Sequence, residues 1–318
     1  MGQTAWGWLV VVYLFLGGLG AGAFLSAAFF ELSGWRYRRD FCPTVLTGAT
    51  ISGPVVALGS VLLILDLGAG KMEPWRIFYL FTNFSSVMTW GIWILCLFIP
   101  VSLFYGFLEL VEVEPFAKGL IWARFPRLLR NLQPTRRWVA IVGSVLAVGV
   151  AIYTGVLISV VGPAVPFWST RMLPFLPIPM MPVLFLVSAL STGMALTFDL
   201  AATIAVPDIH EIMGSMALVH IILIGLENIL IGLLLIMALS EGGAAAESAR
   251  MVMYGPLRIT FWVGVVLIGL VYPFVVHAYA IGAGRHSLWS GIGSGVGIVL
   301  AGLFLRYLIV TAGIPAYL

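Results

Sequence analysis

The chain has 318 residues, of which 61% are hydrophobic and 9% are charged, and its mean hydropathy is +1.10. A soluble globular domain carries about 25% charged residues, so this composition excludes a soluble protein and indicates a membrane protein. The net charge of +3 reflects basic residues in the loops and gives no sign of nucleic-acid binding.

Eight apolar segments are each long enough to cross a bilayer, which takes about 20 residues in a helix. In chain order we expect the helices at residues 6–33, 44–66, 86–110, 138–161, 182–206, 214–239, 258–281 and 290–312. The longest connections, after residues 110 and 161, are too short for a further domain. The predicted fold is therefore an all-α integral membrane bundle, with residues 1–318 forming a single polytopic membrane domain.

The first segment contains YLFLGGLGAGAFLSAAFF, from Tyr13 to Phe30. Glycine stays helical in lipid, where the backbone must bond to itself, and it lets neighbouring helices approach closely. Gly18 and Gly22 have the small-xxx-small spacing, which predicts a packing face. The segment lacks a basic leading region, so we do not expect a cleaved signal peptide.

Basic residues in the loops predict the orientation. Loops after the odd-numbered segments carry Arg36, Arg38, Arg39, Lys118, Arg124, Arg127, Arg130, Arg136, Arg137 and Arg285. Loops on the other side carry Lys71, Arg76, Arg171, Arg250 and Arg258. The positive-inside rule places the richer set in the cytoplasm and both termini outside it.

A short internal similarity relates the first and fifth segments. Leu19, Gly22 and Leu25 match Leu190, Gly193 and Leu196 at a constant offset of 171. Because both segments cross in the same direction, this similarity favours two parallel four-helix bundles.

Polar residues inside the segments fall at two depths, estimated from the helical rise of about 1.5 Å per residue. Tyr13, Tyr153 and Arg306 lie about 10, 12 and 9 Å from the non-cytoplasmic ends of their segments, and Asp66 ends the second segment. These four are candidates for an outer binding site, although a tyrosine at this depth can also be an interfacial anchor and Arg306 can extend towards the surface.

A second set lies deeper or nearer the cytoplasm. Asp199, His220 and His277 lie about 10, 9 and 6 Å from the cytoplasmic ends of their segments. Glu227 is near the middle of the membrane, seven residues after His220 and so on nearly the same helical face. Ionisable groups at such depths are usually functional, and Glu227, His220 and Asp199 form a candidate proton path.

Two other functional classes stay open at this point. His220 and His277 are candidate ligands of a single haem in a cytochrome b-type anchor, with His210 and His286 expected in loops. Eight segments with a parallel repeat are also compatible with a secondary transporter, although no corresponding pair of broken helices is evident. No nucleotide-binding or zinc signature is present, so we expect no metal site.

Several motifs along the whole chain resemble one family, the NrfD/PsrC-type integral membrane subunit of polysulfide reductase. In order they are YLFLGGLGAG (from Tyr13), ILDLGAGKMEPWRIF (from Ile64), SSVMTWG (from Ser85), YTGVLIS (from Tyr153), MPVLFLVSALSTG (from Met181), GLEN (from Gly225) and LRYLIVTAG (from Leu305).

The resemblance implies a quinone-reactive subunit of a respiratory complex in the prokaryotic cytoplasmic (inner) membrane. It implies menaquinone or ubiquinone bound towards the periplasmic face, with no haem in this chain. It also implies a ferredoxin-like four-cluster iron–sulfur subunit, whose [4Fe-4S] clusters exchange electrons with a molybdopterin catalytic subunit or a multihaem cytochrome. On this interpretation Tyr13, Asp66, Tyr153 and Arg306 bind the quinone, and Glu227, His220 and Asp199 carry protons that couple the reaction to the membrane potential.

Overall fold

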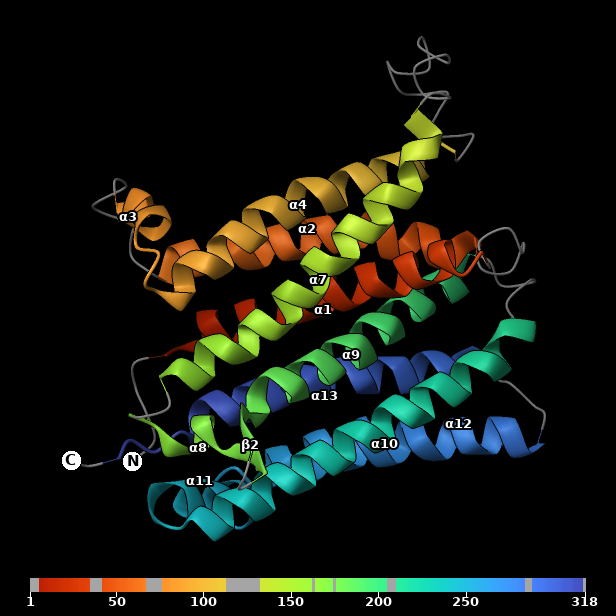
Figure 1. The fold of residues 1–318 in the computed structure, drawn as a ribbon. Coiled ribbons are helices and arrows are strands. Elements are labelled where there is room, and N and C mark those ends of the chain that lie inside the picture. Colours follow the sequence, from red (N-terminus) through yellow and green to blue (C-terminus); the bar gives the residue numbers. More distant parts are fainter. Residues whose placement is uncertain are drawn as a thin grey trace.

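The computed structural model describes residues 6–34, 42–66, 76–112, 132–161, 164–173, 176–204, 210–283 and 288–316. These residues include eight helices long and apolar enough to cross a membrane, which confirms the predicted all-α membrane fold (Figure 1). They are α1 (Trp8–Leu32), α2 (Cys42–Asp66), α4 (Val87–Leu110), α7 (Arg136–Val160), α9 (Met180–Ile204), α10 (His210–Glu241), η4 (Thr260–Val271) continued by α12 (Tyr272–Ala283), and α13 (Leu288–Ala312).

The helix ends differ from the predicted ones by at most two residues, with one exception. The largest difference is at α10, which begins at His210 rather than at residue 214, so His210 belongs to a helix and not to the expected loop. The first half of the seventh helix, η4, is a π-helix, which the sequence did not predict.

Most of the short elements gather at one end of the molecule, where α1 begins and α13 ends (Figure 1). They are α3 (Arg76–Thr82), α8 (Pro166–Ser169), the antiparallel strands β1 (Arg171–Leu173) and β2 (Leu176–Pro179), and α11 (Gly243–Met253). We call this the α11 end. The opposite end, where α7 begins after a short 3-10 turn, η3 (Gln133–Thr135), is called the Arg136 end.

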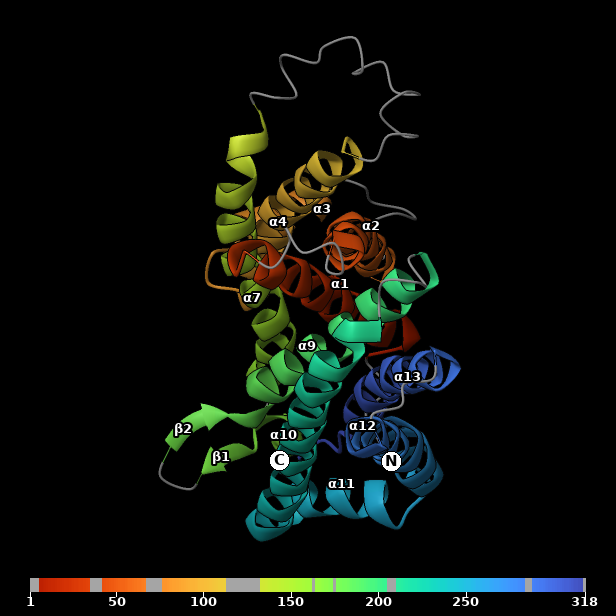
Figure 2. The same ribbon diagram turned by 90° about the vertical axis from the view of Figure 1, so that its right-hand side faces the viewer.

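The helices pack in two groups that meet through α1 and α9. The first group contains α1, α2, α4 and α7, and the second contains α9, α10, η4–α12 and α13. In the view from the Arg136 end, α1 lies between the other helices of its own group and the second group (Figure 2). Because α1 also packs extensively against α9, the groups share a continuous interior.

The crossing of α1 and α9 has no room for side chains at two glycines. A Cβ atom added at Gly22 would overlap the carbonyl group of Ala189, and one added at Gly193 would overlap the backbone of Gly22 and Ala23. A Cβ at Gly18 would lie 3.4 Å from that of Ala189. Small residues therefore let the two backbones touch, and the predicted packing face is confirmed. Gly22 and Gly193 are also the glycines of the internal similarity.

Some pairs of residues that are in contact in the first group correspond, 171 residues further along the chain, to pairs that are in contact in the second group. Gly20 packs against Val56, and the residues 171 further along, Ser191 and Glu227, also interact. Gly106 packs against Ala49, and their counterparts His277 and His220 stack on each other. The same pairs of positions thus meet in both halves, as expected for a parallel repeat.

Several predicted loop cations, at residues 36–39, 71, 118–130 and 285, lie outside the described residues. The assignment of the Arg136 end to the cytoplasm therefore stays a prediction.

Candidate functional site

Tyr13 and Tyr153 form a buried tyrosine pair in the third of the membrane nearest the α11 end. Tyr13 comes from α1 and Tyr153 from α7, and their side chains are only 1% and 4% exposed. The ring of Tyr153 lies on Gly91 of α4, where a Cβ atom would overlap it. The two hydroxyl groups interact with each other, but neither makes a hydrogen bond of regular geometry. Two buried hydroxyls are therefore available to a further polar group.

Arg306 is fully buried on α13 and faces α9. Its Nη1 donates hydrogen bonds to the Ser188 hydroxyl (2.5 Å) and to the Gly302 carbonyl (3.1 Å), and its guanidinium group lies 5.0 Å from the centre of the Phe185 ring. Its Nε and Nη2 have no hydrogen-bond partner among the described residues. A buried guanidinium group with two unpaired nitrogens is costly, and it marks a place where further acceptors are needed.

Glu227, on α10, lies with Arg306, Ser188 and Ser191 in a group of polar residues that we call the arginine cluster. Its carboxyl group lies close enough to the hydroxyls of Ser188 and Ser191 and to the charge of Arg306 to interact with them, although the Ser191 hydroxyl makes no hydrogen bond of regular geometry. The residue is 6% exposed. Within the described chain, Glu227 and Arg306 are not in direct ion-pair contact, but Ser188 interacts with both of them. Three helices of the second group thus bring a cation, a carboxyl group and two hydroxyls together near the middle of the membrane.

The predicted outer site is divided by α1. Gly18 packs on Arg306, with an added Cβ only 3.1 Å from Nη2, whereas Tyr13 faces Tyr153 on α7. The structure therefore brings the two tyrosines together and places Arg306 with Glu227. Asp66 is the last residue of α2, and its side chain is exposed at the α11 end.

The residues predicted nearer the cytoplasm do meet at the Arg136 end of the second group. The rings of His220 and His277, the histidine pair, stack with their centres 4.9 Å apart, and Nε2 of His277 is 2.9 Å from the Ser294 hydroxyl. Nε2 of His220 is buried without a hydrogen-bond partner among the described residues. Nearby on α9, the half-buried Asp199 carboxylate lies against Gly295 of α13, where a Cβ atom would overlap it.

This geometry does not fit a haem held by the histidine pair. Two axial imidazoles bind iron from opposite faces of the porphyrin, which must lie between them. Here the ring centres are only 4.9 Å apart and the ring planes are tilted by 34°, so no space remains between them for a porphyrin.

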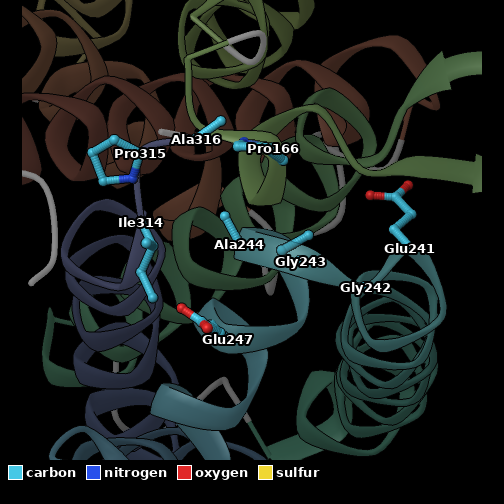
Figure 3. A pocket seen from close by; sticks show the side chains of 10 residues that line it. Pro166, Glu241, Gly242, Gly243, Ala244, Glu247, Ile314, Pro315 and Ala316 are labelled. Carbon is cyan, nitrogen blue, oxygen red and sulfur yellow. The ribbon is translucent and has the colours of Figure 1, made fainter. Parts of the chain in front are cut away.

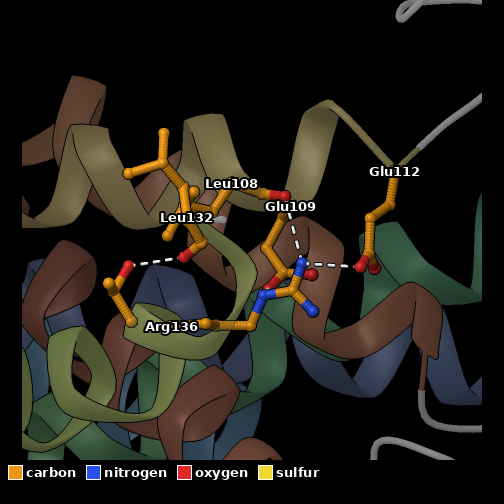
Figure 4. Close-up of polar contacts among 6 residues, drawn as sticks. Leu108, Glu109, Glu112, Leu132 and Arg136 are labelled. Atoms are coloured by element: carbon orange, nitrogen blue, oxygen red, sulfur yellow. Dashed lines mark hydrogen bonds and ion pairs between the residues drawn. The ribbon is translucent and has the colours of Figure 1, made fainter. Parts of the chain in front are cut away.

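An ion-pair cluster lies at the Arg136 end of the first group (Figure 4). Arg136 at the start of α7 is 3.2 Å from Glu109 (Nε to Oε1) and 2.8 Å from Glu112 (Nη2 to Oε1), and it donates to the Leu108 carbonyl. These contacts join the end of α4 to the start of α7. The sequence suggested only a topological role for Arg136, because its two carboxylate partners are not adjacent to it in the chain.

The α11 end has an open cavity of about 560 Å³ (Figure 3). Its wall is formed by Pro166, residues 241–245, Glu247 and residues 314–316. Glu241 accepts hydrogen bonds from the Thr170 hydroxyl and the Arg171 amide, both at 3.4 Å. The Glu241 and Glu247 carboxylates make this recess acidic.

A second, wholly apolar groove runs between α2, α3 and α4, with a volume of about 100 Å³. Leu63, Ile92 and Leu95 are among its lining residues. Ile92 directly follows Gly91, on which the Tyr153 ring lies, so the groove and the tyrosine pair share one stretch of α4.

Ser188, Ser191 and Ser294 were not predicted as site residues. Serine is common in membrane helices, and its hydroxyl usually bonds to the backbone of the preceding turn. The available signal was the three-residue spacing of Ser188 and Ser191, which places both hydroxyls on one face of α9.

Comparisons with known proteins give a consistent result. Residues 1–316 match the family model described as polysulphide reductase, NrfD. The C subunit of polysulfide reductase from Wolinella succinogenes is 33% identical over 98% of this chain and 94% of its own length. Protein NrfD of Escherichia coli is 28% identical over 98% of this chain and 95% of its own length, and an NrfD homolog of Haemophilus influenzae is 25% identical over 87% and 84%.

Proposed function

Since the chain belongs to the polysulphide reductase NrfD family of multi-pass membrane proteins, we propose that it is the quinone-reactive membrane subunit of a respiratory oxidoreductase. In this role it exchanges electrons between menaquinone or ubiquinone and a ferredoxin-like iron–sulfur subunit. The iron–sulfur subunit in turn serves a molybdopterin enzyme or a multihaem cytochrome. This chain is then not the subunit that acts on the terminal substrate.

The tyrosine pair is the observation that carries this proposal. A quinone supplies two-electron, two-proton chemistry, and its ring oxygens need hydrogen-bond donors. Tyr13 and Tyr153 offer two buried hydroxyls without regular partners, from two helices and at one depth. Each hydroxyl can donate to a ring oxygen and can accept or release a proton there.

The apolar groove beside the pair supports the same assignment. It lies between membrane helices α2 and α4 and is lined mainly by aliphatic and aromatic side chains, together with Ser60 and Cys96. Leu80 and Phe81 of the short helix α3 form part of its wall. These surfaces suit the isoprenoid tail of a quinone, which gains from burial of apolar area. Asp66, at the nearby end of α2, is placed to exchange protons between this region and the aqueous phase.

The polar groups of the second half provide the proposed proton path. Asp199, the histidine pair and Glu227 occupy successive depths from the Arg136 end towards the middle of the membrane. Arg306 extends the series to the depth of the tyrosine pair. Proton movement along this series couples the redox reaction to the membrane potential, since these groups gain and lose protons within the bilayer.

The proposed orientation places the α11 end and both termini outside the cytoplasm. Electrons then leave or enter at that end, through a partner docked near α8 and α11. A reporter enzyme that is active only outside the cytoplasm, fused after Leu318, tests this; activity of a cytoplasmic reporter in the same place would contradict it. Purification of the tagged chain from its native membrane should also bring an iron–sulfur subunit with it.

The quinone assignment is tested by Tyr13→Phe and Tyr153→Phe in the purified complex. Each change keeps the ring and removes one hydroxyl. We expect electron transfer between a reduced viologen and a soluble naphthoquinone to fall at least tenfold, the effect of losing about 1.4 kcal/mol in the transition state. Tyr105→Phe is the matched control, because Tyr105 is equally buried on α4 and packs against Phe24 away from the pair. Equal electron-transfer rates in all three variants would show that the tyrosine pair contributes only to packing.

A further inference from the structure

Ser188 interacts with both of the described groups in the arginine cluster that carry a formal charge, Arg306 and Glu227. It accepts a hydrogen bond from Nη1 of Arg306 and interacts with the carboxyl group of Glu227. The serine is 0% exposed, so water from outside does not replace either contact. A hydroxyl has one donor and two acceptor sites. When it accepts from Arg306, its own proton remains free for the carboxylate.

The hydroxyl is oriented unlike those of comparable serines in the membrane helices. Ser26, Ser52 and Ser102 each donate to a carbonyl oxygen of the preceding turn of their own helix. The Ser188 hydroxyl instead accepts a hydrogen bond from Arg306 on another helix, α13. It is therefore not needed to satisfy the backbone of α9.

The repeat shows that the fold does not require a hydroxyl at this position. The counterpart of Ser188 in the first half, 171 residues earlier, is Gly17, and the counterpart of Glu227 is Val56. A Cβ atom added at Gly17 would lie 3.6 Å from the methyl group of Thr154, an ordinary van der Waals contact. The first half thus fills the same place without a polar network, so the network is a specific property of the second half.

We propose that Ser188 is a positioning residue that links the protonation of Glu227 to the hydrogen bonding of Arg306. When Glu227 is ionised, the hydroxyl donates to the carboxylate and holds it near the guanidinium group. When Glu227 binds a proton, the negative charge is lost, the donation weakens, and Arg306 turns its free donors to other acceptors. Ser188 thereby carries a charge change at mid-membrane to the depth of the tyrosine pair. This inference rests on the proton path of the proposed function.

The test compares Ser188→Ala with Ser102→Ala in the purified complex, reconstituted in vesicles that contain a pH-sensitive dye. Ser102 is the matched control because it is also 0% exposed and its hydroxyl bonds to Ile99 of its own helix. We expect Ser188→Ala to slow proton movement about tenfold, while turnover of a soluble naphthoquinone in uncoupled vesicles stays within twofold. Ser188→Cys, which keeps a weak donor of similar size, should give an intermediate rate.

Glu227→Gln separates failure of this inference from failure of the proton path. If Glu227→Gln slows proton movement but Ser188→Ala behaves like Ser102→Ala, the role of Ser188 is overturned and the path stands. If Glu227→Gln is also without effect, the path itself is wrong and the Ser188 inference falls with it. Neither result alters the quinone assignment, which depends on the tyrosine variants.

A second readout needs only the purified chain in detergent. Infrared spectroscopy reports the carbonyl stretching band of a protonated carboxyl group, and loss of that band in Glu227→Gln assigns it. Ser188→Ala should move the Glu227 band to higher frequency, because it removes the weaker hydrogen bond that Ser188 still donates to the protonated carboxyl group. An unmoved band would contradict the inference even if proton movement were slowed, since it would leave only a structural effect.

Discussion

Replacement of Gly193 by alanine should disrupt the crossing of α1 and α9. A methyl group at this position would overlap the backbone of Gly22 and Ala23, and backbone atoms cannot turn aside as side chains do. Restoring ordinary contact requires the helices to separate by about 1 Å, which also weakens the neighbouring contacts of Gly18 and Ala189. Overpacking of this kind costs about 3 kcal/mol, the upper part of the usual range.

The temperature at which the detergent-solubilised chain loses its monodisperse elution measures this cost. We expect Gly193→Ala to lower it by about 6–12 °C, taking 2–4 °C per kcal/mol. Gly232→Ala on α10 is the control, because an added Cβ there meets nothing within 4 Å. Since Gly22→Ala acts on the same crossing, the double variant should lose less than the sum of the two single losses. Equal stability of the Gly193 and Gly232 variants would show that α1 and α9 do not touch in this way.

Three further predictions concern other parts of the molecule. Glu109→Gln should lower the free energy of unfolding by about 3 kcal/mol or more, because it removes a buried partner of Arg136. Glu112→Gln, whose side chain is 45% exposed, should cost less than about 1 kcal/mol in the same thermal assay. Gly18→Ala should leave the melting temperature almost unchanged but slow proton movement, because the added Cβ would press on Nη2 of Arg306; normal proton movement would argue against a role for that nitrogen. The purified chain, supplied with haem, should show no Soret band, and a band lost on replacement of His277 would contradict the geometry of the histidine pair.

The features predicted well from the sequence are those governed by distance along a helix. A bilayer requires about 20 apolar residues for each crossing, and eight such segments stand out clearly. The helical rise then places Tyr13 and Tyr153 at one depth and His220 and His277 at another. Both pairs meet in the structure.

The sequence could not predict how each helix is rotated about its own axis. A membrane helix is apolar around its whole circumference, so no amphipathic stripe tells which face meets which neighbour. Tyr13 and Gly18 are five residues, or about 140°, apart on α1. Tyr13 therefore faces α7, whereas Gly18 faces Arg306. Estimates of depth alone could not show that Arg306 lies apart from the two tyrosines. The short elements at the α11 end were missed because they are brief and largely apolar.

The helices that cross at Gly22 and Gly193 belong to two related halves of one chain, and this affects where ionisable groups can lie. A dimer of two identical subunits meeting at such a point would have to carry every ionisable group twice or not at all. A single polypeptide with two related halves is free of that symmetry. This chain keeps Gly20, Val56, Ala49 and Gly106 as inert packing on one side and places Ser191, Glu227, His220 and His277 at the matching positions on the other. At these positions the first half thus packs without ionisable groups, while the second half carries residues of the proposed proton path.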